Sequence, residues 1–185
     1  MTIANRSIDD VLAATEPLMV TEAETPTPVK EVVLVAESGD LERTWATLIL
    51  ATSAAASGMR VSIFFTFWGL FPLVRGDVRI TGRNPMQRML SVLQRPGIAH
   101  LKLSRFNFAG MGPWMMKRLA RQQGVALPPE LLELALAMDV KFIPCQMSLD
   151  MLGIRRDQLI DGVEEPAGAA AALELMARAN ASLFI

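Results

Sequence analysis

The only cysteine in the 185-residue chain, Cys145, is the side chain best suited to covalent chemistry. A thiolate attacks sulfur in thiol–disulfide exchange, so a single cysteine can accept and release a sulfur-bound group. Cys145 follows the apolar run Val140–Ile143 and Pro144, a pattern typical of a buried strand that ends at the proline. We expect a helix directly afterwards, with Ser148 as its N-cap and Gly153 at its end.

This position suits a reactive thiol, but it also suits an inert one. The free amides and positive dipole at a helix N-terminus favour the thiolate, and Asp150 fits the first turn of such a helix. Free cysteines, however, are among the most commonly buried residues, and most of them act as small apolar side chains. On the residues alone the inert interpretation is the more frequent one, and both stay open.

The surrounding chain has the pattern of an α/β domain. Two apolar strands, Glu31–Ala36 and Arg60–Thr66, flank an Ala- and Leu-rich helix over Leu41–Ser57, which is typical of a right-handed βαβ unit. Further helices are expected to begin at Asn84, Pro113, Pro128 and Pro166, with a last strand over Ala181–Ile185. The sequence therefore predicts a mostly parallel sheet flanked by helices.

Residues after the first two strands could line a site together with the cysteine. Glu37 and Asp40 follow the first strand, and Trp68 follows the second. Because the carboxyl ends of parallel strands meet at one edge of a sheet, we expect these residues to share that edge with Cys145, which would lie in its middle. Glu37 and Asp40 are equally well explained as turn and N-cap residues.

Charge and composition divide the chain into a tail and one domain. Residues 1–29 carry five acids, one arginine and several prolines, and we expect a flexible acidic tail before a domain over residues 30–185. Residues 75–121 hold ten lysines and arginines and one acid, a net charge of +9, although the whole chain has a net charge of −1. We treat residues 76–124 as a basic insertion into the domain.

The insertion contains a predicted helix in which large apolar residues lie beside lysines and arginines. In it, Trp114 and Met115 precede Lys117, Arg118 and Arg121. This composition suits a lid over a site, a helix on a membrane surface or a docking face for an acidic protein. Nucleic acid is not an expected partner, because no recognised binding module is present.

Several classes of protein lack support in the sequence. One cysteine allows no internal disulfide, and one histidine, His100, makes a histidine-based metal site implausible. No phosphate-binding glycine loop, secretory signal or spanning apolar segment is apparent. We expect a cytoplasmic protein without a bound cofactor.

From Glu31 to Ile185 the chain resembles the DsrE/DsrF-like family of small sulfur-relay proteins. The resemblance depends on Glu31–Asp40, on Phe64–Leu70, on the Gly110–Gly112 segment, and above all on the pattern C-x-M-S-x-D-x-x-G, which begins at Cys145 and includes Met147, Ser148 and Asp150. It implies a flavodoxin-like α/β fold, a homo-oligomer, and a persulfide carried on Cys145.

The resemblance also implies partners and has limits. It implies exchange of sulfane sulfur with other proteins, such as a TusA-like carrier or a rhodanese-like donor, and a carrier rather than a multiple-turnover enzyme. The insertion is longer than in small relay subunits, and no acid or histidine matches a catalytic partner. Two alternatives stay open: a flavodoxin-like small-molecule binding domain with an inert cysteine, and a membrane-surface adaptor.

Overall fold

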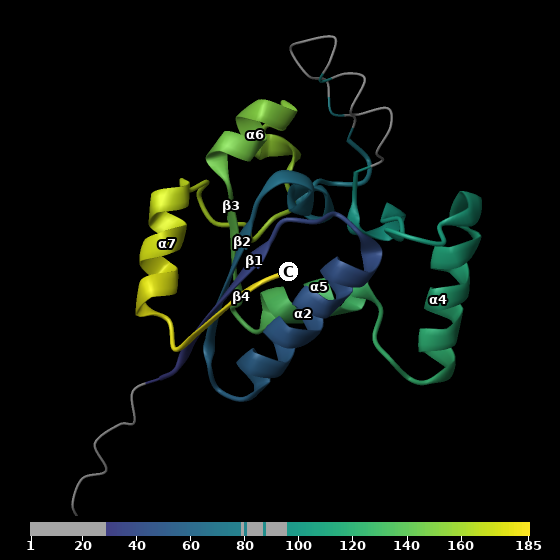
Figure 1. Ribbon diagram of the computed structural model, residues 1–185, viewed down its shortest axis with the longest axis horizontal. Coiled ribbons are helices and arrows are strands. Elements are labelled where there is room, and N and C mark those ends of the chain that lie inside the picture. Colours follow the sequence, from purple (N-terminus) through teal and green to yellow (C-terminus); the bar gives the residue numbers. More distant parts are fainter. Residues whose placement is uncertain (1–28, 79, 81–86, 88–95) are drawn as a thin grey trace, which may run out of the picture.

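The computed structural model describes residues 29–78, 80, 87 and 96–185 (Figure 1). The strands in this part of the chain are β1 (Glu31–Ala36), β2 (Arg60–Phe65), β3 (Lys141–Pro144) and β4 (Ala181–Phe184). Its α-helices are α2 (Leu41–Ala56), α4 (Met111–Gln122), α5 (Pro128–Ala137), α6 (Gln146–Leu152) and α7 (Ala169–Arg178). The 3-10 helices are η1 (Phe67–Leu73), η2 (Ile98–His100), η3 (Phe108–Gly110) and η4 (Arg156–Gln158).

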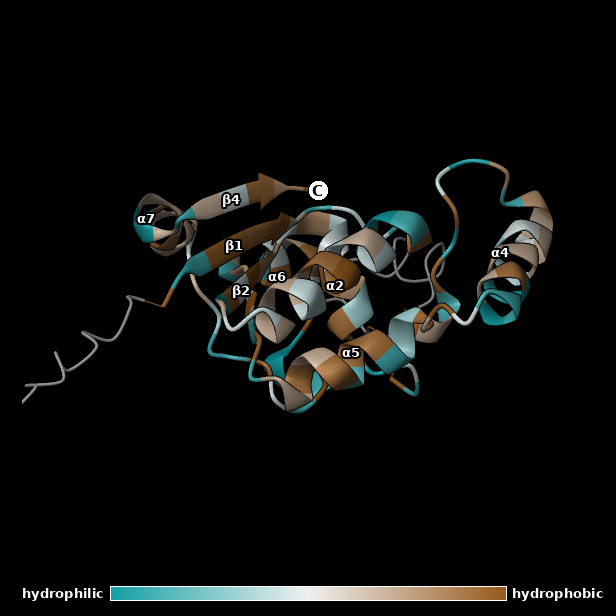
Figure 2. Cartoon of the chain, turned by 90° about the horizontal axis from the view of Figure 1, so that it is seen from below, coloured by the Kyte–Doolittle hydropathy of each residue, from teal (hydrophilic) through white to brown (hydrophobic). Residues whose placement is uncertain are grey.

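The four strands form one sheet in the order β3-β2-β1-β4, and all three pairings are parallel. Helices lie on both faces of the sheet, with α2 and α5 packed together on one face and α7 near β1 on the other (Figures 1 and 2). The predicted α/β fold with a parallel sheet between helices is therefore confirmed.

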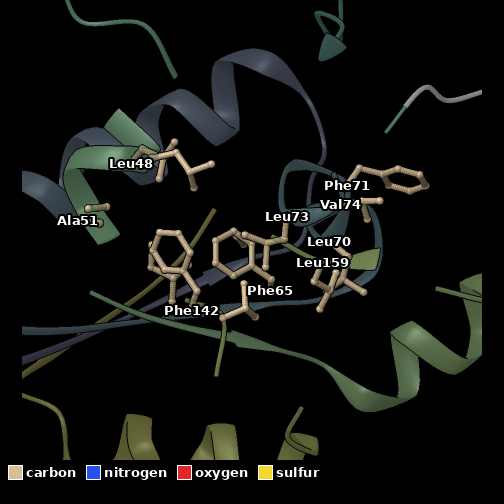
Figure 3. Packing of buried hydrophobic residues seen from close by; sticks show 14 of the residues in the cluster. Leu48, Ala51, Phe65, Leu70, Phe71, Leu73, Val74, Phe142 and Leu159 are labelled. Atoms are coloured by element: carbon tan, nitrogen blue, oxygen red, sulfur yellow. The ribbon is translucent and has the colours of Figure 1, made fainter. Parts of the chain in front are cut away.

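The main core lies between the sheet and the α2–α5 face. Alternate residues of a strand point to opposite faces, and Phe65 and Phe142 point to this side, where their rings meet edge to face at 5.4 Å. Figure 3 shows both rings between α2, represented by Leu48 and Ala51, and the residues of η1. The chain after β2 turns sharply into η1 and thereby closes this core at the carboxyl edge of the sheet.

The other face is covered more thinly. Its buried cluster consists of Val35, Phe64 and Cys145 from the strand region together with Ala172 of α7. Ala172 is the only buried residue of α7. The cysteine therefore lies on the face with the smaller cover.

Several predicted boundaries were off by a few residues. The helix predicted from Pro113 begins at Met111, and the helix predicted from Pro166 begins at Ala169. The first strand agrees to the residue. The helix expected after Asn84 and the tail at residues 1–28 fall outside the described residues.

The segment of residues 106–122, called the arm from here on, consists of η3, α4 and the residues just before them. Figure 2 shows α4 set apart from the sheet and from α2 and α5. The arm folds back on itself at its base, because Gly112 lies so close to the Phe106 carbonyl oxygen that a Cβ there would be 2.0 Å from it. Within α4 only Gly112 and Pro113 are buried.

Candidate functional site

Backbone hydrogen bonds fix Cys145 from two sides. Its N–H donates to the carbonyl oxygen of Phe65 at 2.8 Å, which continues the pairing of β3 with β2. On the other side, Gln146 N–H donates to the Ala167 carbonyl at 3.0 Å, and Ala167 N–H donates to the Pro144 carbonyl at 2.9 Å. The cysteine backbone is thus held between β2 and the segment that leads to α7.

The thiol itself is buried, with 3% of the residue exposed. It points to the thin face of the sheet, where it packs with Val35, Phe64 and Ala172. As the residue preceding α6, Cys145 is the N-cap, but its side chain makes no capping hydrogen bond. The thiol is therefore not accessible to a partner in this conformation, because α7 lies over it.

Ser148 does not cap the helix, contrary to the prediction. The N-cap is Cys145, three residues earlier, and Ser148 lies completely buried inside the helix. The Ser148 hydroxyl is 3.0 Å from Thr66 Oγ1 and accepts a hydrogen bond from Phe67 N–H, also at 3.0 Å. Ser148 therefore connects α6 to the end of β2. These hydrogen bonds also satisfy the serine hydroxyl, which would be costly to bury without a partner.

The remaining residues of the cysteine motif have local roles in α6. The Asp150 carboxylate accepts a hydrogen bond from the Gln146 amide at 3.0 Å. Gly153 ends the helix with a φ of 68°, in the left-handed region that favours glycine. Met147 is exposed, and so is Met151 one turn later. The motif thus combines a buried anchor with an exposed apolar surface beside the cysteine.

The predicted neighbours of Cys145 share its edge of the sheet but not its pocket. Glu37, at the end of β1, pairs with Arg43 at 3.4 Å, and Asp40 accepts a hydrogen bond from the Ser38 hydroxyl at 2.9 Å and is the N-cap residue of α2. The prediction that Cys145 lies in the middle of this edge is wrong. The strand order is β3-β2-β1-β4, so Cys145 follows β3, which lies at one side of the sheet.

Trp68 lies on η1, which contacts α6, the helix that follows the cysteine. Its ring stacks on Phe71 with 5.8 Å between centroids, and its outer surface is exposed. Phe67 beside it is also exposed and has a φ of 44°. We call the four exposed apolar side chains of the contacting elements η1 and α6 the cysteine rim: Phe67, Trp68, Met147 and Met151.

The arm does not cover the cysteine of its own chain. Trp114 and Met115 are exposed on α4, and no residue of the arm belongs to the cluster around Cys145. α4 and α6 lie on different sides of the molecule in Figure 1. The predicted lid is therefore wrong for the arm within one chain. A different part of the insertion does reach α6, since the Gln87 amide donates to the carbonyl oxygens of Asp150 and Met151.

The cations of the arm are crowded. Burial and the neighbouring Arg121 lower the pKa of Lys117, whose ammonium donates to the Ala99 carbonyl at 2.9 Å. The Arg118 guanidinium lies 5.6 Å from the centre of the Trp114 ring. Within the described part of the chain, no group of acids, histidines and cysteine could hold a metal ion, and no helix is long and apolar enough to cross a membrane.

Sequence reasoning missed the fastening of α6 to β2. Neither Thr66 nor Ser148 carries a signal that they meet across the sheet edge. It also missed that Phe67 and Met151 are exposed. The one available signal was the spacing of Met147 and Met151, which places both on one face of a helix.

Comparison with known proteins defines the family. Residues 28–184 match the model of the DsrE/DsrF/DrsH-like family. The chain belongs to this family. The sulfur carrier protein DsrE2 of Allochromatium vinosum is 36% identical over 158 residues, which cover 84% of this chain and 98% of that protein. The uncharacterized protein YrkE of Bacillus subtilis is 35% identical over 156 residues, covering 84% of this chain and 97% of that protein.

A solved structure supports the fold. The crystal structure of the ychN protein from E. coli superimposes with a TM-score of 0.53 at 19% sequence identity, and the match covers 85% of this chain and all of that one. The resemblance to the DsrE/DsrF-like family and the predicted fold class are both confirmed by these comparisons.

Proposed function

We propose that this DsrE-like protein is a sulfur carrier that holds a persulfide on Cys145 and passes sulfane sulfur between proteins. The observation that carries the proposal is the placement of the only thiol of the chain at the carboxyl end of β3, where backbone bonds hold it from both sides. Similarity to the sulfur carrier protein DsrE2 over 84% of this chain adds support.

The transfer needs no cofactor and no net redox change. The Cys145 thiolate attacks the outer sulfur of a donor persulfide, a new sulfur–sulfur bond forms, and the donor leaves as a thiolate. In the second step an acceptor thiolate attacks the outer sulfur of the Cys145 persulfide, and the Cys145 thiolate leaves. Each step breaks one sulfur–sulfur bond and forms another, so a general acid or base is not required.

Burial of the thiol fits storage better than immediate exchange. The apolar cluster of Val35, Phe64 and Ala172 would keep a bound persulfide away from water and oxidants between transfers. Exchange then requires α7 to move, and the cover it provides is thin, because Ala172 is its only buried residue. A helix that buries few apolar side chains can separate from the sheet at a low free-energy cost.

The partners follow from the chemistry. Donors and acceptors are proteins with persulfide or thiol groups, such as a rhodanese-like donor and a TusA-like carrier. We place the protein in the cytoplasm, where thiols stay reduced, and expect a homo-oligomer acting as a carrier rather than as a multiple-turnover sulfurtransferase.

Mass measurement of the intact protein tests the proposal. Incubation with a sulfane-sulfur donor should add the mass of one sulfur atom to the native chain, and a reductant should remove it. Because Cys145 is the only cysteine, a Cys145→Ser chain must gain nothing. A native chain that stays at its original mass, after both a small persulfide and a loaded carrier protein, would exclude the carrier function.

The burial of Cys145 favours a second candidate, a binding domain of the same fold in which the cysteine is only a core residue. Iodoacetamide separates the two. In a binding domain with an inert cysteine, alkylation should proceed only as fast as global unfolding. In a carrier, α7 must open locally, so alkylation should be much faster than global unfolding.

A further inference from the structure

The two edges of the sheet differ in how they are covered. Along β3, the Glu164 N–H donates to the Phe142 carbonyl at 2.8 Å, and a bridge joins Cys145 to Ala167. β4, by contrast, pairs with β1 and with no other strand of the described chain. Figure 2 shows β4 at the margin of the molecule, and all four of its residues are exposed. One edge is therefore covered, and the other is open.

The hydrogen bonds of β4 show which of its backbone groups point outward. The Ile185 N–H donates to the Val35 carbonyl at 2.8 Å, and the Ile185 carbonyl accepts from the Glu37 N–H at 3.2 Å. Backbone groups of successive residues in a strand point alternately to its two sides. The N–H and C=O groups of Ser182 and Phe184 therefore point to the open edge, where they can pair with another strand.

The open edge has none of the side chains that usually prevent such pairing. Edge strands are commonly protected by lysines, other charged residues or prolines, and β4 has the sequence Ala-Ser-Leu-Phe. Leu183 and Phe184 are 46% and 67% exposed. Because neighbouring residues of a strand point to opposite faces, both faces of the sheet are apolar at this edge.

Phe184 also continues an apolar row across the sheet. In the register of the strands, Ile143, Phe64, Val35 and Phe184 lie side by side on β3, β2, β1 and β4. Phe64 and Val35 are buried in the cluster around Cys145, whereas Phe184 is exposed. The row that carries the cysteine cluster is therefore uncovered where it reaches the open edge.

We propose that β4 of one copy of this chain pairs antiparallel with β4 of a second copy, so that the two sheets become one. A two-fold axis through this contact places Leu183 opposite the partner's Leu183. Ser182 then exchanges backbone hydrogen bonds with the partner's Phe184, and Phe184 does so with the partner's Ser182. On the face that carries the cysteine cluster, the two phenylalanine rings lie diagonally across the contact, within reach of each other.

The charges at this edge fit a second copy of the chain. Like charges directly opposite each other destabilise a strand pair, and β4 contains no charged residue. On the flanking elements, Glu31 of β1 pairs with Arg60 at 2.6 Å, and Glu174 of α7 pairs with Arg178 at 3.5 Å. An uncharged apolar strand can thus pair with an identical strand without electrostatic cost.

The contact also affects the helix over the thiol. Only Ala179 and Asn180 separate α7 from β4, so a paired β4 restrains the carboxyl end of α7. Opening of α7 over Cys145 then proceeds from its amino end, which follows Gly168. The pairing itself uses backbone groups and apolar side chains, and it stands whether or not Cys145 carries sulfur.

Disulfide formation between two copies tests the proposal. In a chain with Leu183→Cys and Cys145→Ala, the two new thiols lie on opposed residues outside the hydrogen-bonded pairs, about 4.5 Å apart between Cα atoms. This separation suits a disulfide. Mild oxidation should therefore yield linked dimer severalfold above that of the control, Leu134→Cys with Cys145→Ala. Leu134, on α5, is also 46% exposed. Equal yields, or no dimer above background, would exclude the pairing.

A charge test on chains with the native cysteine checks the register. Ser182→Lys with Phe184→Lys places like charges opposite each other between copies, whereas Ser182→Lys with Phe184→Glu places opposite charges there. In equilibrium sedimentation, the first variant should associate severalfold more weakly than the native chain, and the second should associate nearly as well. Both positions are exposed, so urea midpoints at low protein concentration should agree between the two variants.

The remaining outcomes would overturn the proposal. A native chain that stays monomeric at micromolar concentration would leave the open edge to a strand of another protein. Native association that the first variant does not weaken would assign self-association to another surface. Equal weakening in both variants would show that Ser182 does not lie opposite the partner's Phe184.

Discussion

The cluster that Cys145 forms with Val35, Phe64 and Ala172 is buried, whereas most of the large apolar side chains of α4 face outward. Ser148 and Thr66 satisfy each other at the cysteine edge, and Cys145 packs under α7. On α4, by contrast, Trp114 and Met115 are 61% and 63% exposed. One region buries its apolar side chains, and the other exposes them.

The difference separates two tasks that a sulfur carrier must perform. A stored persulfide requires a dry and fixed environment, which a completed cluster provides. Recognition of another protein requires exposed surface, which the arm and the cysteine rim provide. The following predictions test whether changes at the cysteine edge mainly lower the free energy of unfolding, and whether changes in the arm mainly affect binding to other proteins.

The largest contrast should appear between Phe142→Ala and Met115→Ala. Phe142 is fully buried on β3, and its truncation should lower the free energy of unfolding by about 3–5 kcal/mol. Met115 is exposed, so its truncation should change that free energy by less than about 0.5 kcal/mol. Urea titrations at low protein concentration measure both. Similar losses would mean that the arm belongs to the folded core.

Two glycines offer a matched pair of clashes. A Cβ on Gly69 would lie 2.1 Å from the Ala36 carbonyl oxygen, and one on Gly112 would lie 2.0 Å from that of Phe106. Gly69→Ala displaces backbone at the sheet edge and should cost about 1–3 kcal/mol of unfolding free energy or more. Gly112→Ala should leave the urea midpoint nearly unchanged but speed proteolytic cleavage within the arm. Equal shifts of the midpoint would contradict this division.

Ser148→Ala should lower the free energy of unfolding by an intermediate amount and should also change the reactivity of Cys145. The change leaves Thr66 Oγ1 and Phe67 N–H without the serine hydroxyl, and a loss of about 1–3 kcal/mol is expected. Because α6 is then less firmly held, iodoacetamide should modify Cys145 faster under native conditions. Met147→Ala, on the exposed face of the same helix, serves as the control. An unchanged alkylation rate would show that α7 alone governs access to the thiol.

The sequence predicted the fold correctly where the local residue pattern agrees with the burial found in the structure. β1 is a continuous apolar run that a parallel sheet buries on both faces, and its bounds were predicted to the residue. Gly58, with a φ of 76°, follows α2 as expected of a helix end. Strand order was not readable, because no local signal tells that β2 rather than β3 neighbours β1.

The candidate site was readable only in part. The position of Cys145 between a strand and a helix followed from Pro144 and the residues after it. The start of α6 was misplaced because serine favours the N-cap in general, whereas Ser148 bonds across the sheet edge to Thr66. The arm was recognised as basic and amphipathic, but periodicity cannot tell which surface a helix covers.

The smallest effect expected is on transfer kinetics, and it concerns the arm alone. Reversal of Lys117, Arg118 and Arg121 to Glu should slow sulfur transfer from an acidic carrier protein severalfold at low salt. Charges near a docking surface mainly raise the association rate, and salt screens them. Loading of Cys145 from a small persulfide should hardly change, since α7 rather than the arm covers the thiol.

A control with the same change in net charge makes this prediction specific. Reversal of Arg60, Lys141 and Arg178 alters three exposed cations at the amino end of the sheet, far from the cysteine edge. That variant should transfer sulfur from the carrier protein at nearly the native rate. Equal slowing in both variants would indicate a net-charge effect rather than docking by the arm. Equal loss of loading from the small persulfide and from the carrier protein, in the arm variant alone, would place the arm in the cysteine pocket instead.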